Sequence, residues 1–304
     1  LENGVNFFDT AELYPVPATP DKYADTEKII GNWFSKTGNR DKVILATKIA
    51  GPGDYTAHIR KTGFKGNSIN EAVEGSLKRL QTDYIDLYQL HWPERITNTF
   101  GNRSFQYFND SWEDNFEEIL HILKSLIGEG KIRHVGLSNE NPWGIMKFLE
   151  YVKKGLPKMI TIQNPYSLLN RLFEVGSSEI CKRESVGLLA YSPLGFGVLS
   201  GKYMNKKMPE NSRLDLFPNL KRYSNVNSFK ATELYNEIAN KHGISLTDLS
   251  LSFVNDRPFV TSNIIGATSI SQLKENIESI NVKLSPEIIK EINEVNELIP
   301  NPAP

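Results

Sequence analysis

Four polar residues, each at or just after the end of a short apolar segment, carry the side chains needed to protonate a carbonyl oxygen. Asp9 and Tyr14 follow one such segment, Lys48 follows a second, and His91 follows a third. A phenol is a proton donor, a nearby ammonium favours its ionised form, and a carboxylate keeps that ammonium charged and oriented. An imidazole can hydrogen-bond the same substrate oxygen. If the four side chains converge, they form a proton-donating site.

Further polar side chains occupy the same kind of position along the chain. They are Ser138, Asn139, Gln163 and Tyr191, again at or just past the ends of apolar segments. One such residue has an ordinary structural interpretation, because an isolated Asp-x4-Tyr pair is usually a turn cap and a half-buried aromatic. Seven residues at or just past such ends form a pattern, and α/β barrels build their active sites from the carboxyl ends of many strands. The seven are Asp9, Lys48, His91, Ser138, Asn139, Gln163 and Tyr191.

A proton donor for a carbonyl oxygen is useful only if a hydride reaches the carbonyl carbon. Proteins have no hydride donor of their own, so a nicotinamide cofactor is implied. We find no metal-ligand constellation and no Gly-x-Ser-x-Gly motif that would offer a different reaction. The single cysteine, Cys181, can form neither an internal disulfide nor a cysteine-rich zinc site.

Composition is that of an ordinary globular protein. Hydrophobic residues make up 39% of the 304 residues, charged residues 23%, and the net charge is -1. No dense block of Lys and Arg favours nucleic acid, and no run of eighteen apolar residues or signal-peptide pattern favours a membrane. We therefore expect a cytoplasmic protein with a small-molecule substrate, no nucleic-acid or membrane partner, and an oligomeric state that the sequence does not indicate.

Apolar segments and helical patterns alternate along the chain without a break in composition. Strands are predicted at residues 5–8, 43–47, 84–90, 132–137, 159–162, 186–190 and 264–265. Helices are predicted at 26–36, 68–80, 115–128, from 141, and at 228–242, 247–254, 269–279 and 285–298. The helix over 26–36 is expected to bury Ile29, Ile30, Trp33 and Phe34, and Ser68-Ile-Asn-Glu71 is typical of a capping box.

Two architectures with parallel sheets compete for this pattern. A doubly wound dinucleotide fold requires Gly-x-Gly-x-x-Gly, but Gly51 and Gly53 lack the third glycine, and Gly195 and Gly197 are followed by Gly201 at the wrong spacing. A (β/α)8 TIM barrel fits better. We expect one α/β barrel domain over residues 1–304.

Several motifs resemble, in order, those of the aldo-keto reductases over essentially the whole chain. They are Phe8-Asp9-Thr10-Ala11-Glu12-Leu13-Tyr14, Lys48, Tyr84-Ile-Asp86-Leu-Tyr-Gln-Leu-His91, Gly136-Leu-Ser138-Asn139, Tyr191-Ser-Pro-Leu194 and Gln272-Leu-Lys-Glu275-Asn276. Within the family, His91-Trp92-Pro93, Asn164-Pro-Tyr-Ser-Leu-Leu-Asn170 and Leu194-Gly-Phe-Gly197 look like the bacterial Tas-type reductases, which are similar to the potassium-channel β subunits.

The resemblance implies a role for each of these positions. Asp9, Tyr14, Lys48 and His91 would be the catalytic tetrad, with Tyr14 the general acid. The cofactor would be NADP(H), with Ser138, Asn139 and Gln163 on the nicotinamide carboxamide and Tyr191 stacked on the ring. The remaining cofactor contacts would be Ser192, Leu194 and Gly195 in a strap over the pyrophosphate that runs to Lys202, then Arg213, Gly266 and Gln272 near the phosphate end, and Glu275 and Asn276 beside the adenine.

One departure from the family pattern affects the cofactor phosphate. Many reductases of the family have Lys-Ser and an Arg where this chain has Gly266-Ala267 and Gln272. We therefore expect Lys202 and Arg213 to meet the phosphate charge, although a solvated surface position remains the alternative for both. Tyr191 could likewise be a core residue, and Asp86 is expected to cap or pair structurally.

The family's first strand and the turn before it are expected upstream of Asp9, so the sequence given is expected to be truncated at its N-terminus. Seven strands are counted, and the barrel is expected to be open between residues 5–8 and 264–266. Unpaired edges of buried parallel strands promote aggregation.

The main alternative to a carbonyl reductase is a cofactor-binding regulatory subunit that senses redox state, as the resemblance to the channel β subunits permits. The tetrad does not separate the two functions. The substrate itself is expected to be selected by the loops at residues 52–66 and 92–114. The second loop has no periodicity and contains the aromatic residues Phe100, Phe105, Tyr107, Phe108 and Trp112.

Overall fold

The computed structural model describes residues 1–105 and 111–304. Tyr107 and Phe108 of the loop at residues 92–114, called the aromatic loop below, therefore lie outside the described residues. The chain divides into two compact units. The first unit comprises residues 1–99 and 104–162, and the second comprises residues 100–103 and 163–304. Each is described by itself below, and the expectation of a single domain stays a prediction.

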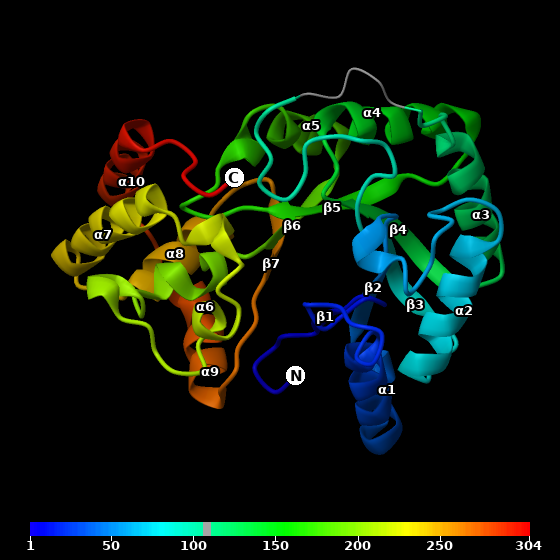
Figure 1. The fold of residues 1–304 in the computed structure, drawn as a ribbon, viewed down its shortest axis with the longest axis horizontal. Helices are drawn as coiled ribbons and strands as arrows, with labels where there is room; N and C mark the ends of the chain where they lie inside the picture. Colours follow the sequence, from blue (N-terminus) through cyan, green and yellow to red (C-terminus); the bar gives the residue numbers. More distant parts are fainter. Residues whose placement is uncertain (106–110) are drawn as a thin grey trace. The chain divides into compact units, whose positions relative to one another are not determined.

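The first unit is built on parallel strands with helices between them (Figure 1). Its strands are β1 (Phe7–Asp9), β2 (Ile44–Ile49), β3 (Ile85–Leu90) and β4 (Ile132–Ser138), and β5 (Met159–Pro165) begins in it. Its helices are α1 (Asp25–Thr37), α2 (Ser68–Leu80), α3 (Phe116–Gly128) and α4 (Pro142–Glu150), with short 3-10 turns η1 (Arg40–Lys42), η2 (Asp54–Thr56) and η3 (Tyr151–Lys154).

The strand register of the first unit brings the candidate catalytic residues to one end of the sheet. Asp9, the last residue of β1, is paired with Ala46, and Lys48 is paired with Gln89 of β3. Alternate residues of a strand share a face, so Ala46 and Lys48 point the same way. All the residues of β3 and five of the six of β2 are buried, as expected for parallel strands covered on both faces.

The second unit completes β5 and adds two more parallel strands, β6 (Gly187–Tyr191) and β7 (Val260–Ile264). Its helices are α5 (Ser177–Glu184), α6 (Arg213–Leu216), α7 (Val226–Lys241), α8 (Leu246–Asn255), α9 (Ile270–Glu278) and α10 (Pro286–Leu298). The 3-10 turns are η4 (Leu172–Glu174), η5 (Gly195–Ser200), η6 (Met204–Lys206), η7 (Lys221–Tyr223) and η8 (Ser279–Asn281).

The strands follow one another in the sheet in chain order, from β1 to β7. Parallel strands in sequential order, connected through helices, define the α/β class of the (β/α)8 TIM barrel. Seven strands lie among the described residues, as the sequence predicted, and β1 and β7 stand at the two ends of the order. No helix among the described residues is long and apolar enough to cross a membrane.

Local sequence signals placed most helix ends correctly. Gly38 ends α1 in a left-handed conformation with φ of 64°, and the hydroxyl of Ser285 accepts a hydrogen bond from the backbone N–H of Ile288 at the start of α10. Pro142 occupies the first turn of α4, as predicted. Asp86 accepts hydrogen bonds from Arg40, Arg133 and the Leu45 backbone, which is the structural role expected for it.

Three local expectations were wrong. The capping box is absent, because α2 begins at Ser68 itself and the Ser68 hydroxyl bonds Thr62 instead of the helix backbone. The buried face of α1 contains Glu27, Gly31 and Phe34, while Ile29 is 66% exposed. The last strand, β7, begins at Val260, four residues before its predicted start, and ends at Ile264.

Candidate active site

The Lys48 ammonium lies at the centre of the first unit's polar cluster. Its side chain is fully buried, and its Nζ lies 2.5 Å from Oδ2 of Asp9 and 2.8 Å from the carbonyl oxygen of Thr10. Burial lowers the pKa of Lys48, while the Asp9 carboxylate acts in the opposite direction. Gln89 donates to the other Asp9 oxygen at 3.2 Å. The carboxylate is therefore held in place from two sides.

Tyr14 lies against this ion pair and against His91. The Lys48 Nζ is 5.1 Å from the centre of the Tyr14 ring, and the Tyr14 and His91 rings meet edge to face with centroids 5.5 Å apart. The structure thus brings Asp9, Tyr14, Lys48 and His91 together, as the sequence predicted. Lys48 differs from the expectation in one detail, because it lies within β2 and not after it.

The short turn that carries Tyr14 is fixed by Glu12. The Glu12 carboxylate is buried, and it accepts hydrogen bonds from the Ala50 backbone at 2.6 Å and from both terminal nitrogens of Arg60 at 2.6 and 3.0 Å. The Glu12 backbone N–H also donates to the Lys48 carbonyl. Sequence reasoning missed Glu12 and Arg60 as residues that position the site. A buried carboxylate 48 positions from its partner leaves no local pattern.

His91 is held as a neutral imidazole. It is 6% exposed, and burial together with the nearby Lys48 charge places its pKa well below the ordinary value for histidine. Among the described residues its Nδ1 has no hydrogen-bond partner. The carbonyl oxygen of His91 accepts a hydrogen bond from the Asn139 side chain at 2.9 Å, which ties the end of β3 to the end of β4.

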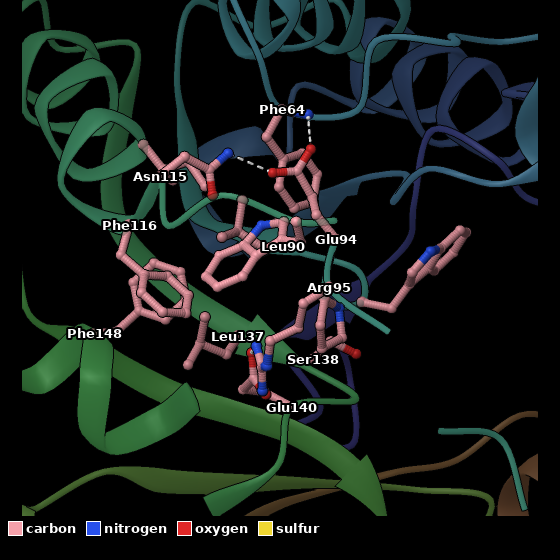
Figure 2. A pocket seen from close by; sticks show the side chains of 14 residues that line it. Phe64, Leu90, Glu94, Arg95, Asn115, Phe116, Leu137, Ser138, Glu140 and Phe148 are labelled. Atoms are coloured by element: carbon pink, nitrogen blue, oxygen red, sulfur yellow. Dashed lines mark hydrogen bonds and ion pairs between the residues drawn. The ribbon is translucent and has the colours of Figure 1, made fainter. Parts of the chain in front are cut away.

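The turn after β4 presents Ser138 and Asn139 in a constrained geometry. Asn139 has a left-handed φ of 52°, and its amide nitrogen lies 3.1 Å from the Ser138 hydroxyl. The next residue, Glu140, forms a bidentate ion pair with Arg95 of the loop after β3, and Figure 2 shows the two side chains facing each other. Arg95 also lies over the Trp143 ring at 4.9 Å. This buried pair fixes the β4 turn.

The cavity drawn in Figure 2 is too small for a substrate. Its volume is about 20 Å³, which has room for roughly one water molecule. Glu94 closes one side by accepting hydrogen bonds from the Phe64 backbone and the Asn115 side chain. The residues that line this cavity pack the described part of the aromatic loop against α3. They support the site and do not bind a substrate.

In the second unit, the segment after β6, predicted to be the pyrophosphate strap, has an unusual backbone conformation. Ser192, Gly195, Phe196 and Gly197 all have positive φ, between 51° and 88°. The Gly195 N–H donates to the Ser192 carbonyl at 2.9 Å, so the segment begins with a tight turn. Tyr191 precedes this segment at the end of β6, and Leu194 accepts hydrogen bonds from the N–H groups of Gly197 and Leu199.

Two cations of the second unit are held beside this strap. Lys202 lies across Gly197, where an added Cβ would come within 2.7 Å of the lysine Cε, so a larger residue there would displace the lysine side chain. The guanidinium of Arg213 lies over the Phe196 ring at 4.6 Å from its centroid. The Arg213 side chain is nonetheless exposed, at the start of α6. Both cations predicted to meet a phosphate are therefore next to the strap.

The remaining predicted contacts of the second unit lie at three places. Gln163 is 3% exposed within β5, and not after it as predicted. Asn276 of α9 is 7% exposed and its amide nitrogen is 3.5 Å from the Gly266 carbonyl after β7. Gln272 and Glu275 are exposed on α9, and the Gln272 side chain accepts hydrogen bonds from Thr268.

One residue near Tyr191 was missed by the sequence analysis. Arg222 donates from Nη1 to the Tyr191 hydroxyl at 3.4 Å and from Nε to the main-chain oxygen of Pro304 at 2.5 Å. Arg222 ends a basic segment without periodicity, so its sequence context gives no signal. One group among the described residues has metal-ligand spacing, His242 with Glu287 and Glu291, but Lys241 pairs with both carboxylates at 3.5 and 2.6 Å.

The chain is therefore an α/β barrel with a buried Lys-Asp pair beside a tyrosine and a histidine. The family model of the aldo/keto reductase family matches residues 1–297. The chain belongs to this family. It is 45% identical to Protein tas of Escherichia coli over 307 aligned positions, which cover 100% of this chain and 89% of that protein.

Two further relatives support the assignment. An aldo-keto reductase of Babesia bovis is 40% identical over 252 positions, covering 78% of this chain and 88% of the relative. The uncharacterized oxidoreductase YrpG of Bacillus subtilis is 32% identical over 301 positions, covering 97% of this chain and 84% of the relative. Membership of the family supports oxidoreductase activity on carbonyl groups of small molecules.

Proposed function

We propose that the protein reduces an aldehyde or ketone to an alcohol with NADPH, and that Tyr14 donates the proton. The observation that carries the proposal is the buried Lys48–Asp9 pair, whose ammonium lies 5.1 Å from the Tyr14 ring. An ammonium beside a phenol stabilises the phenolate that remains after the proton has left. This is the electrostatic help that a general acid of high intrinsic pKa needs at neutral pH.

The four side chains divide the chemistry among them. As the carbonyl carbon gains a hydride, the π electrons of the C=O bond move to oxygen, and that oxygen takes the Tyr14 proton to give the alcohol. Lys48 stabilises the phenolate until solvent returns the proton. His91, kept neutral by burial, would orient the carbonyl oxygen by a hydrogen bond from its ring. When bound, NADPH supplies the hydride.

Donor chemistry in each unit supports a nicotinamide cofactor. Ser138, Asn139 and Gln163 offer hydroxyl and amide groups, which match the mixed donors and acceptors of a carboxamide. The tightly turned backbone after Tyr191, with positive φ at Ser192, Gly195, Phe196 and Gly197, would hold the pyrophosphate. Gly266, Gln272, Glu275 and Asn276 stay proposed contacts from the family pattern.

The preference for NADPH over NADH rests on Lys202 and Arg213. Both cations lie at the strap, Lys202 across Gly197 and Arg213 over Phe196. A guanidinium and an ammonium suit a doubly charged phosphate, and neither has a role beside a ribose hydroxyl. We therefore assign them to the phosphate that distinguishes NADPH from NADH.

The test of the reductase is an assay of NADPH oxidation over a panel of aldehydes, ketones and quinones, followed by Tyr14→Phe on the best substrate. Loss of the general acid should lower kcat by roughly 10²–10⁴-fold and leave the Kd for NADPH unchanged. Tyr151→Phe, a change of the same kind at a ring that lies 4.7 Å from the exposed Lys154 ammonium, serves as the control. Near wild-type turnover of Tyr14→Phe, with hydride transfer limiting, would contradict the role of Tyr14.

The same assay separates the reductase from the regulatory-subunit alternative. A regulatory subunit would bind NADPH but oxidise it negligibly with every carbonyl of the panel. The cytoplasmic location expected from the sequence also stays a prediction.

A further inference from the structure

The second unit contains a cavity whose lining is strongly positive. Its volume is about 600 Å³, which is in the range of small-molecule binding sites. Arg103, Lys221 and Arg222 line it, and none of the described residues in its lining is an aspartate or glutamate. The whole chain has 35 Lys and Arg against 36 Asp and Glu, so this imbalance is a local property of the cavity.

The three cations have no acidic side chain as a partner within the described part of the chain. None of them forms an ion pair there, whereas seventeen ion pairs occur elsewhere among the described residues. Arg103 and Arg222 each donate to one main-chain oxygen, of Asn301 and Pro304 respectively. A guanidinium has five N–H donors, so each arginine keeps donors for a ligand.

The rest of the lining suits an apolar body. Phe100, Phe196 and Leu220 line the same cavity, and the Phe100 side chain is 53% exposed. The wall formed by residues 302–304 is firmly held, because Asn225 donates to the Pro302 carbonyl at 2.8 Å and the Ala303 N–H donates to the Leu169 carbonyl at 3.0 Å. Such a site is formed before a ligand arrives.

The cavity adjoins Tyr191 and the strap, which are the parts of the second unit proposed to bind the cofactor. Arg222 connects it to the Tyr191 hydroxyl, and Phe196 belongs both to the cavity lining and to the strap. Tyr191 is the residue proposed to stack on the nicotinamide ring. A molecule in the cavity would therefore lie beside the expected position of the reacting ring.

We propose that this cavity selects carbonyl substrates that carry an anionic group, such as a carboxylate, on an apolar body. The inference rests on the proposed reductase function and narrows its substrate class. Lys221 and Arg222 bind the anion, Arg103 adds to the positive potential, and the aromatic and aliphatic lining covers the body of the substrate.

The test compares two substrates that share a reacting aldehyde and a ring, 4-formylbenzoate and its methyl ester. The measured quantity is the ratio of their kcat/KM values in wild type and in variants, which removes the intrinsic reactivity of each aldehyde. Lys221→Gln and Arg222→Met should each lower the acid-to-ester ratio about tenfold, the effect of losing a charge-assisted hydrogen bond. Lys182→Gln, which removes an exposed cation of α5 outside the cavity, should leave the ratio unchanged.

Two further measurements test whether the cations instead bind the cofactor phosphate or only hold residues 301–304 in place. If the anion belongs to the cofactor phosphate, Lys221→Gln raises the Kd of NADPH relative to NADH and leaves the acid-to-ester ratio unchanged. If the cations only hold residues 301–304, the variants lower the melting temperature and again leave the ratio unchanged. Either result overturns the inference.

Failure of the reductase proposal is distinguishable from failure of the inference. If wild type reduces neither aldehyde, the reductase proposal is contradicted. Calorimetric titration with 4-formylbenzoate then tests, without any reaction, whether the cavity binds an anion. Weaker binding of the acid by Lys221→Gln than by Lys182→Gln supports an anion site. Equal binding overturns it.

Discussion

Two lysines of this molecule, Lys48 and Lys221, lie in opposite environments. Lys48, in the first unit, is fully buried, lies 2.5 Å from a carboxylate and is surrounded by fixed hydrogen bonds. Lys221, in the second unit, is exposed, lines a cavity of about 600 Å³ and has no ion-pair partner among the described residues. The first cation is proposed to take part in the chemistry that every substrate shares. The second is proposed to bind a group that differs between substrates.

The difference has a physical cause in the cost of burying charge. A charge removed from water is tolerated only when a partner and further hydrogen bonds replace the solvent, so Lys48 needs Asp9. An exposed ammonium keeps its water and needs no partner. Such a cation favours ligand binding, because the anionic group of the ligand does not have to displace an acidic side chain of the protein from it.

The largest expected effect comes from breaking the buried pair. Asp9→Asn leaves the Lys48 ammonium buried without its counter-charge, and should lower the free energy of unfolding by about 3–5 kcal/mol. The measurement is urea unfolding at neutral pH. Asp25→Asn removes the carboxylate of the exposed Asp25–Lys28 pair, whose side chains are 41% and 54% exposed, and should cost about 0–1 kcal/mol. Similar losses for the two variants would remove the contrast between buried and exposed cations.

A smaller effect, on cofactor affinity and not on stability, is expected from the strap cations. The double variant Lys202→Ala with Arg213→Ala should reduce the preference for NADPH over NADH by roughly tenfold to a hundredfold, since each loses a charge-assisted bond to the phosphate. Dissociation constants from fluorescence titration measure this. Lys206→Ala with Lys207→Ala removes two exposed cations of the same segment and is the matched control. An unchanged preference in the first double variant would show that the phosphate site is elsewhere.

The smallest effect concerns the pH dependence of stability that the neutral His91 creates. Because its pKa is depressed in the folded protein, the unfolded chain binds more protons below about pH 6.5, and stability falls as the pH falls through that value. This one group should remove up to about 2 kcal/mol between pH 7.5 and 5. His91→Gln should flatten the dependence in unfolding curves at several pH values, and His121→Gln, at an exposed position of α3, should not. An equally steep dependence in His91→Gln would contradict the buried neutral state.

The local sequence was sufficient for most elements and for the residue types of the site. Continuous apolar segments predicted the parallel strands, because strands covered on both faces need apolar side chains throughout. Gly38, Pro142 and Ser285 marked helix ends, since their backbone preferences act within a single turn. The order of Asp9, Tyr14, Lys48 and His91 predicted a tetrad through the family pattern, and the structure brings these four side chains together.

Tertiary structure alone decided which distant side chains meet. The capping box failed because Ser68 found a partner in Thr62, and Ile29 is exposed because the buried face of α1 includes Gly31, where an added Cβ would come within 2.2 Å of the Arg79 carbonyl oxygen. Arg60 and Glu12 are 48 positions apart, and Arg222 meets Tyr191 from a segment without periodicity. Periodicity and capping report on neighbours within a few residues. Contacts across dozens of residues depend on how the elements pack, which no local pattern encodes.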